Sequence, residues 1–428
     1  MSTPATYGPI ASRTLERQGT DPGSHAWGPS PVSETGDSPG FSRLPSRENS
    51  GTVPKPHICF VAPTTWPLFS GDRDIPVVGG AEVQQSFIAP ALAARGYRVS
   101  MIALDYGQPD RSVVKGVTVH RIYRPDEGLP VVRFVYPRLT TLWRVLGEVD
   151  ADVYYQRTAA ALTGFVAAFC RRHGKGSIYS GASDVDFLPG RQDITYARDR
   201  WLFQYGVRNV DRVFAQNATQ QERVREHFGR ESIVVPNCYA APRGAGADRA
   251  GYVLWVATVR AQKRPEMFLE MARRLPGQRF VLVGGSDSDR AGLEYARAIS
   301  EAAAALPNVE YRGFMPFGEA DRVFDGARLV VNTSTYEGFP NTFLQAWARG
   351  IPTVAFVDTR SRAADGLPAY DIVDDMPAAI ARVGSLMRDD AAWERASSRV
   401  SRHFREHHSL DAVVGLYERE IAALARTP

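Results

Sequence analysis

The chain has 428 residues, 44% of them hydrophobic and 23% charged, so it can bury the cores of two globular domains without disulfide or metal support. Its 51 Lys and Arg against 47 Asp and Glu leave a formal net charge of +4, which is too balanced to indicate a nucleic-acid partner. The three cysteines, Cys59, Cys170 and Cys238, lie far apart and show no metal-ligand spacing, a pattern that fits a reducing compartment.

Residues 1–55 are the first predicted segment. They are rich in Ser, Pro and Gly and poor in aliphatic residues, and such a composition cannot bury enough surface to offset the entropy of ordering. We therefore expect a disordered tail. The first residues lack the apolar core of a signal peptide, and the longest apolar run, from Ala159 to Cys170, is too short to span a bilayer. We therefore expect a cytoplasmic protein.

Residues 56–240 alternate between short apolar runs and helical patterns. His57 to Ala62 predicts a strand, and a helical pattern from Ala81 to Ala94 follows it and stops at Gly96. Further strands are predicted at 99–103, 117–120, 153–155, 177–179, 213–215 and 233–235, with helices at about 138–148, 159–173, 195–209 and 218–228. Apolar strands that alternate with helices indicate βαβ units and a parallel sheet covered on both faces.

Residues 240–248 are low in complexity and are the best candidate for a linker. The alternation restarts in residues 250–408. Strands are predicted there at 252–256, 280–283, 309–311 and 329–332, with helices at 266–275, 293–305, 320–324 and 341–349. Residues 409–428 carry apolar side chains at helical spacing, and we expect this last helix to pack at the domain junction.

The predicted fold class is therefore α/β, with two Rossmann-like doubly wound domains that face a cleft. The first domain covers residues 56–240 and the second covers residues 250–408. In such sheets ligands bind beyond the carboxyl ends of the strands, so the cleft between the domains is the expected binding site.

The segment from Ser334 to Trp347 follows one of these predicted strands. It reads as a loop and then a helix that begins near Asn341, which can cap the helix so that the free N–H groups of the first turn favour an anion. Gly338 lets the backbone approach a ligand closely, and the Glu337 carboxylate can accept hydrogen bonds from ligand hydroxyls. The alternative is an ordinary helix start with a solvated Glu.

The segment from Val253 to Pro265 places cations after another strand. Its loop carries Arg260, Lys263 and Arg264, and Pro265 suits the first turn of the next helix. Cations at the carboxyl end of a strand suit a diphosphate and would stabilise charge on a departing group. The alternative is a solvated basic loop.

Two further loops of the first domain could border a ligand. Gly79 and Gly80 precede the first helix, which begins with Ala81-Glu82, and make a loop that favours an anion, although a plain tight turn is the alternative. Asp184 and Asp186 follow a later strand, where the alternative is a pair of solvated loop acids.

Other polar motifs favour no metal or cofactor site. Asp287-Ser-Asp289 follows two glycines in a predicted turn, and His407-His408 is expected on a surface turn. No His and Cys set has zinc spacing and no P-loop is present, so we expect no metal cofactor.

The stretch from Glu337 to Gln345, which begins Glu-Gly-Phe-Pro-Asn, resembles the Glu-x7-Glu signature of retaining glycosyltransferases with the two-domain GT-B fold. This family-4 or group-1 type includes many bacterial polysaccharide and glycolipid assembly enzymes, and the resemblance covers about residues 57 to 425. It implies that Glu337 contacts hydroxyls of the donor sugar of a nucleotide-sugar. In the family the second acid of the signature normally contacts the ribose hydroxyls. Here Gln345 stands in its place, without the negative charge but with an acceptor oxygen. The implied donor-binding residues are Gly338, Phe339, Pro340, Asn341, Thr342, Gln345, Gly79 and Gly80.

The resemblance also implies a set of catalytic and acceptor-side residues. The family usually has Gly-Arg-Leu and then a Lys in the basic loop; here Thr258 stands at the Arg position, Lys263 matches, and Arg260 is expected to replace the missing guanidinium. The implied catalytic residues are Glu337, Arg260 and Lys263, which would act with retention at the sugar and front-face departure of the phosphate. The acceptor-side candidates are Glu82, Asp184 and Asp186.

The resemblance indicates only the chemical class of the substrates. The expected acceptor is a saccharide, a lipid-linked molecule or a small molecule, with a weak peripheral membrane contact through first-domain arginines at the inner face of the cytoplasmic membrane as one option. Two rival functions stay open at this point: a nucleotide-sugar epimerase on the same architecture, and a non-catalytic sugar-nucleotide or glycan-binding protein, which the Gln345 and Thr258 departures suggest.

Overall fold

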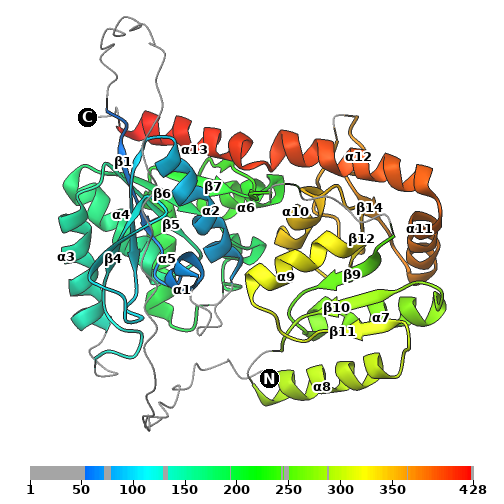
Figure 1. The fold of residues 1–428 in the computed structure, drawn as a ribbon. Coiled ribbons are helices and arrows are strands. Elements are labelled where there is room, and N and C mark those ends of the chain that lie inside the picture. Colours follow the sequence, from blue (N-terminus) through cyan, green and yellow to red (C-terminus); the bar gives the residue numbers. More distant parts are fainter. Residues whose placement is uncertain are drawn as a thin grey trace, which may run out of the picture. The chain divides into compact units, whose positions relative to one another are not determined.

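The structure is a computed structural model that describes residues 54–71, 79–128, 134–192, 194–241, 244, 250–286, 289–363 and 365–425. The predicted tail lies outside these residues except for its last two positions, and most of the predicted linker at 240–248 lies outside them as well. The described part of residues 55–428 belongs to one compact unit that holds two sheets (Figure 1).

Within the described residues the first sheet has eight strands, in the order β3-β4-β2-β1-β5-β6-β7-β8. They are β1 His57–Val61, β2 Arg98–Ala103, β3 Arg111–Val114, β4 Val117–Arg121, β5 Val153–Arg157, β6 Gly176–Ser180, β7 Arg212–Ala215 and β8 Ile233–Val234. All neighbouring pairs are parallel except β3 and β4. Strands β1 and β5 are buried along their whole length, as a sheet covered on both faces requires.

The helices of the first domain follow the predicted alternation. They are α1 Trp66–Ser70, α2 Gly80–Ala94, η1 Phe134–Leu139, α3 Thr140–Val149, α4 Ala161–His173, η2 Asp184–Phe187, α5 Ala197–Asn209 and α6 Ala218–Phe228. Local signals explain their ends: the Asn217 side chain caps α6 by accepting from the Gln220 N–H, and Gly174 and Gly229 end α4 and α6 in the left-handed conformation. Cys59 and Cys170 are buried between strand β1 and helix α4, as their apolar neighbours predict.

The second sheet has six strands within the described residues, in the order β11-β10-β9-β12-β13-β14, and all of its pairs are parallel. The strands are β9 Tyr252–Val256, β10 Phe280–Val283, β11 Val309–Tyr311, β12 Ala327–Asn332, β13 Thr353–Ala355 and β14 Asp371–Ile372. The helices are η3 Ala261–Lys263, α7 Pro265–Arg274, α8 Arg290–Ala304, α9 Phe317–Val323, η4 Phe324–Gly326, α10 Asn341–Trp347, α11 Met376–Arg388 and α12 Asp390–His407. Two separate clusters of buried apolar side chains pack against this sheet, so the second domain has a core of its own.

The last helix, α13 Leu410–Ala425, corrects one prediction. Its apolar residues Val413, Tyr417 and Ile421 join the core of the first domain, beside strands β1 and β5, instead of filling the domain junction. Figure 1 shows α13 in red next to α2 in blue, and Arg95 at the end of α2 forms ion pairs with Asp411 and Glu418 of α13. The chain therefore returns to the first domain after completing the second.

None of the helices in the described ranges combines the length and the apolar character that crossing a membrane requires. The fold class predicted from the sequence is confirmed: both domains are doubly wound α/β units with parallel strands.

Candidate functional site

A pocket of about 410 Å³ lies at the carboxyl ends of the strands of the second sheet. Its second-domain wall comes from the ends of β9 and β10 and from helices α9 and α10, and its first-domain wall comes from the start of α2. The predicted site residues that line it are Gly79, Gly80, Arg260, Asn341, Thr342 and Gln345. The sequence therefore predicted residues that share one pocket, although they come from segments more than 250 positions apart.

The glycines of the first domain leave the pocket open. Gly79 precedes α2 and Gly80 is its first residue, and a Cβ on Gly80 would lie 3.1 Å from the Asn341 Nδ2. A Cβ on Gly79 would overlap the carboxylate of Glu82, whose Oε1 accepts a 2.6 Å hydrogen bond from the Thr64 hydroxyl. Side chains at these positions would fill space that a ligand can use.

A second pair of glycines was not predicted as part of the site. Gly284 and Gly285 follow β10 and line the same pocket. A Cβ on Gly284 would overlap the carbonyl oxygen of Ala257, and a Cβ on Gly285 would lie 2.9 Å from the Phe314 side chain. The available signal was the same as for Gly79 and Gly80, two glycines directly after a buried strand, but the sequence reading treated this pair only as a turn.

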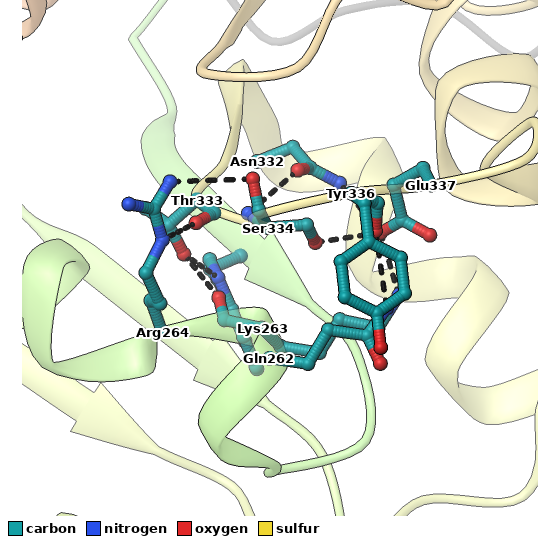
Figure 2. Close-up of polar contacts among 9 residues, drawn as sticks. Gln262, Lys263, Arg264, Asn332, Thr333, Ser334, Tyr336 and Glu337 are labelled. Carbon is teal, nitrogen blue, oxygen red and sulfur yellow. Dashed lines mark hydrogen bonds and ion pairs between the residues drawn. The ribbon is translucent and has the colours of Figure 1, made fainter.

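Glu337 is the centre of a polar cluster beside strand β12 (Figure 2). Its Oε1 lies 2.6 Å from Lys263 Nζ, and it also accepts a 2.6 Å hydrogen bond from the Ser334 hydroxyl and a 3.4 Å hydrogen bond from Asn332 Nδ2. The side chains of Lys263 and Glu337 are 19% and 11% exposed, so this ion pair is largely removed from water. All three of these contacts hold Glu337 through the same oxygen, Oε1.

The loops that carry Lys263 and Glu337 are cross-linked to each other. Figure 2 shows Arg264, whose Nε donates to the Thr333 carbonyl at 2.6 Å, and the Thr333 hydroxyl, which donates back to the Lys263 carbonyl at 2.5 Å. Gln262 donates through Nε2 to the Tyr336 carbonyl at 3.0 Å. The two strand-end loops are therefore held together as one rigid unit, and Arg264 stabilises this unit by donating to backbone carbonyls.

The two predicted cations take different places. Arg260 lines the pocket, whereas the Lys263 ammonium reaches the Glu337 carboxylate. From the sequence we expected both side chains to contact a departing phosphate. In the structure Lys263 forms an ion pair, so its charge is shared with Glu337.

Asn341 corrects a prediction about the helix start. The residue that precedes the helix is Pro340, and Asn341 is the first residue of α10, so its side chain does not cap the helix. The Asn341 Oδ1 instead accepts from Gln84 Nε2 at 3.1 Å and from Asn237 Nδ2 at 3.4 Å. Asn341 therefore joins helix α10 of the second domain to the first domain. Helix α10 has only 7 residues, so its dipole is weaker than that of a long helix.

Gln345 is buried at 5% exposure, and its Nε2 donates to Asp321 Oδ1 at 2.7 Å. Asp321 lies on α9 and was not predicted as part of the site. Nothing in the local sequence marks it, because the contact depends on how α9 packs against α10.

Phe339 and Pro340, which the resemblance implies to be donor-binding residues, pack their side chains into the protein. Pro340 is buried, and the Phe339 ring packs against Trp347 and His408, with centroids 5.9 and 4.7 Å apart. His408 is not on a surface turn, which corrects another prediction: it is 4% exposed and its Nδ1 lies 2.8 Å from the Asn237 carbonyl oxygen. Burial lowers the pKa of His408 to about 3, so its imidazole is neutral at pH 7.

Two of the three acids predicted on the acceptor side, Asp184 and Asp186, separate in the structure. Asp186 is 5% exposed and accepts from the Ala182 and Ser183 N–H groups at 2.7 and 3.3 Å, so it fixes the turn of η2 instead of facing the cleft. Burial raises the pKa of Asp186. Asp184 accepts a 2.9 Å hydrogen bond from Gln220 and lies next to Gly338: a Cβ on Gly338 would come within 3.9 Å of Asp184 Oδ1.

Among the described residues, no cluster of three or more His, Cys, Asp or Glu side chains suits a metal ion. Of the Asp287-Ser-Asp289 motif, Asp287 and Ser288 lie outside the described residues, and Asp289 caps α8 by accepting from the Gly292 N–H.

Comparisons with known proteins assign the two domains separately. The Glycosyltransferase Family 4 model matches residues 78–240, and the Glycosyl transferases group 1 model matches residues 250–389. A curated relative, D-inositol 3-phosphate glycosyltransferase of Mycolicibacterium smegmatis, is 26% identical over 246 residues, which are 54% of this chain and 56% of that protein. The chain thus spans about half the length of the curated relatives it matches.

Solved structures are similar over most of the chain. Sucrose-phosphate synthase from Thermosynechococcus elongatus aligns with a TM-score of 0.68 and 18% identity, over 86% of this chain and 100% of that chain. Anabaena HepE, solved in complex with UDP and glucose, aligns with a TM-score of 0.63 and 14% identity, over 86% of this chain and 100% of that chain. Identities this low support the fold alone. The two family models match one domain each and together cover more than half of the chain, so this chain belongs to the group-1, family-4 glycosyltransferases of the GT-B fold.

Proposed function

We propose that this protein transfers a sugar from a nucleotide-diphosphate-sugar donor to a hydroxyl group of an acceptor. The observation that carries the proposal is the largely buried Lys263–Glu337 ion pair, which stands on the strand-end loops of the domain that matches the group-1 glycosyltransferases. The M. smegmatis relative is named as a glycosyltransferase, and a structural neighbour was solved with UDP and glucose, which supports a nucleotide-sugar as the donor class.

In this proposal the second domain binds the donor. Glu337 Oε1 is occupied by Lys263, Ser334 and Asn332, so the Oε2 oxygen accepts hydroxyls of the donor sugar. Arg260 lines the pocket and stabilises negative charge on the diphosphate. Lys263, three residues further along the same loop, forms its ion pair with Glu337. Gly79, Gly80 and Gly284 leave the backbone bare where the diphosphate and the nucleoside enter.

The first domain then binds the acceptor, with Glu82 beside Gly79 and Asp184 beside Gly338 as its candidate acids; Asp186 is excluded because its carboxylate accepts hydrogen bonds from its own turn. The bond between the anomeric carbon and the phosphate oxygen breaks, and the acceptor oxygen bonds to the same face of the sugar. Bonding on the face that the phosphate leaves gives retention, and the acceptor proton passes to the departing phosphate oxygen. Exclusion of water from the pocket limits hydrolysis of the donor.

The proposed pathway is the assembly of a polysaccharide, a glycolipid or another glycoconjugate, in the cytoplasm or at the inner face of the cytoplasmic membrane, and the proposed reaction needs no metal ion. An epimerase is the second candidate class for the same ligand. It would convert the nucleotide-sugar without releasing nucleotide, and a binding protein would retain the nucleotide-sugar unchanged.

The test is acceptor-dependent release of nucleoside diphosphate from a panel of nucleotide-sugars, each offered with saccharide and lipid-linked acceptors and with EDTA present. We expect release that requires an acceptor, and its loss in the Glu337→Ala variant while the protein stays folded, with a melting temperature lowered only by the loss of the Lys263–Glu337 ion pair. Glu301→Ala, an exposed residue of α8 that pairs only with Arg297 among the contacts of the described chain, is the control. Conversion of the donor without release, or tight binding with no turnover on any acceptor, would count against transfer.

A further inference from the structure

The side-chain amide of Gln345 has a fixed orientation. Its Nε2 donates to Asp321 Oδ1 at 2.7 Å, and the residue is 5% exposed and lines the pocket. An amide has one donor end and one acceptor end on the same carbon. Because the donor end is turned to α9, the carbonyl oxygen is the end that is left for a ligand.

Asp321 is itself held from three directions. Its Oδ1 also accepts a 2.6 Å hydrogen bond from the Tyr239 hydroxyl, and its Oδ2 forms a 2.9 Å ion pair with Arg349, whose side chain is 1% exposed. Burial and the neighbouring Asp321 raise the pKa of Tyr239, so the hydroxyl stays protonated and donates. A carboxylate with these partners can only accept, which forces the amide of Gln345 to present Nε2 to it.

The family resemblance implies that position 345 contacts the ribose hydroxyls of a nucleotide donor; we infer that Asp321 is a positioning residue that turns the Gln345 carbonyl oxygen towards the pocket so that it can accept from them. This inference rests on the proposed function and specifies which residue orients that contact. A buried acceptor that loses its hydroxyl partner remains unsatisfied, so the site should discriminate against a deoxy sugar.

The same geometry explains why position 345 carries an amide. A carboxylate at this position would stand at hydrogen-bond distance from the Asp321 carboxylate, with no proton between the two. Two carboxylates so close cannot both stay ionised without a large cost, because like charges repel in a partly buried site. Gln345 supplies an acceptor oxygen and avoids this repulsion, so residues 321 and 345 are coupled in charge.

The test is calorimetric titration of the full chain with uridine, guanosine and adenosine diphosphates, followed by the 2′,3′-dideoxy form of the tightest binder. The parent should bind the ribose form about tenfold more tightly than the dideoxy form, and Gln345→Ala should reduce this preference towards unity. Gln345→Glu should bind the ribose form about tenfold more weakly than the parent does. It should also bind that form more weakly than Gln345→Ala does. The double variant Gln345→Glu with Asp321→Asn should recover to within about threefold of the parent, because the new amide can donate to the new carboxylate.

Asp325→Asn is the matched control, since Asp325 pairs with the same Arg349 but does not contact Gln345. It should keep the ribose preference. Gln345→Ala that keeps the full preference, or a double variant no better than Gln345→Glu alone, would overturn the inference and leave the proposed function standing. A parent that binds none of the three diphosphates would overturn the proposed function, and the inference with it.

Discussion

The two walls of the pocket are built on different principles. On the first-domain side the wall consists of Gly79, Gly80 and Val83, which offer backbone and little else. On the second-domain side Gln345 is fixed by Asp321, and the loop that carries Arg260 is cross-linked to the next strand-end loop through the Lys263–Glu337 pair. The second-domain side is therefore held by side-chain contacts, as the proposed donor site requires, whereas the first domain mainly leaves room.

The largest expected effect comes from removing charge from the strand-end loops on the second-domain side. Glu337→Gln should lower the rate of sugar transfer by about 100-fold or more, because a preorganised acceptor of the donor sugar is lost and Lys263 loses its partner. Each single change, Glu337→Gln or Lys263→Met, should also lower the free energy of unfolding by about 2 kcal/mol, since it strands one largely buried charge.

The double variant Lys263→Met with Glu337→Gln separates stability from chemistry. It removes both charges, so thermal unfolding should return to within about 1 kcal/mol of the parent, while transfer stays lost. A double variant that regained transfer would show that the pair only holds the fold. Rates are measured by nucleotide release, and stability by calorimetric or spectroscopic melting.

Substitutions of the pocket glycines compare the two walls directly. Gly284→Ala places a Cβ on the Ala257 carbonyl, which is backbone and cannot move aside, so we expect a loss of about 3 kcal/mol in the free energy of unfolding. Gly80→Ala places a Cβ 3.1 Å from the flexible end of the Asn341 side chain, so its melting temperature should stay close to that of the parent. Equal melting temperatures for the two variants would contradict the view that the second-domain wall is the rigid one.

The sequence predicts the parts of this molecule that depend on local pattern. Strands β1, β9 and β10 are continuous apolar runs because both of their faces are buried, and their positions agree with prediction. Strand β3 was missed because it lies at a sheet edge and alternates exposed with partly buried residues, a pattern too short and too polar to stand out.

The site residues likewise fall into those that local pattern predicts and those that depend on packing. Gly80, Arg260 and Gln345 were predicted together because the carboxyl ends of parallel strands meet at one edge of a sheet. Asp321 and the buried position of His408 were not, because each depends on how two helices pack together, and no local spacing records that. Asp186 was wrongly placed on the acceptor side because an acid that caps its own turn has the same sequence pattern as one that faces a ligand.

The smallest predicted effect concerns the contact between the two walls. His408 links Asn237 of the first domain to Phe339 of the second-domain loop, and burial lowers its pKa to about 3 from an ordinary value of 6.5. The unfolded chain therefore takes up a proton at His408 between these two values, whereas the folded chain does not. Stability from this residue is complete above pH 6.5 and declines as the pH falls, by about 1 kcal/mol between pH 7 and pH 5.5.

The measurement is the free energy of unfolding in urea at pH 7 and at pH 5.5, for the parent and for His408→Gln. The parent should lose more stability than the variant, because Gln can still donate to the Asn237 carbonyl but takes up no proton. His57 and His403 also have pKa values lowered to about 4 by burial, so the variant should keep part of the pH dependence. His407→Gln is the matched control: that side chain is 52% exposed, and its replacement should leave the difference between the two pH values unchanged. An identical loss in the parent and in His408→Gln would mean that His408 is solvated, and that the contact between the two walls does not depend on a neutral imidazole.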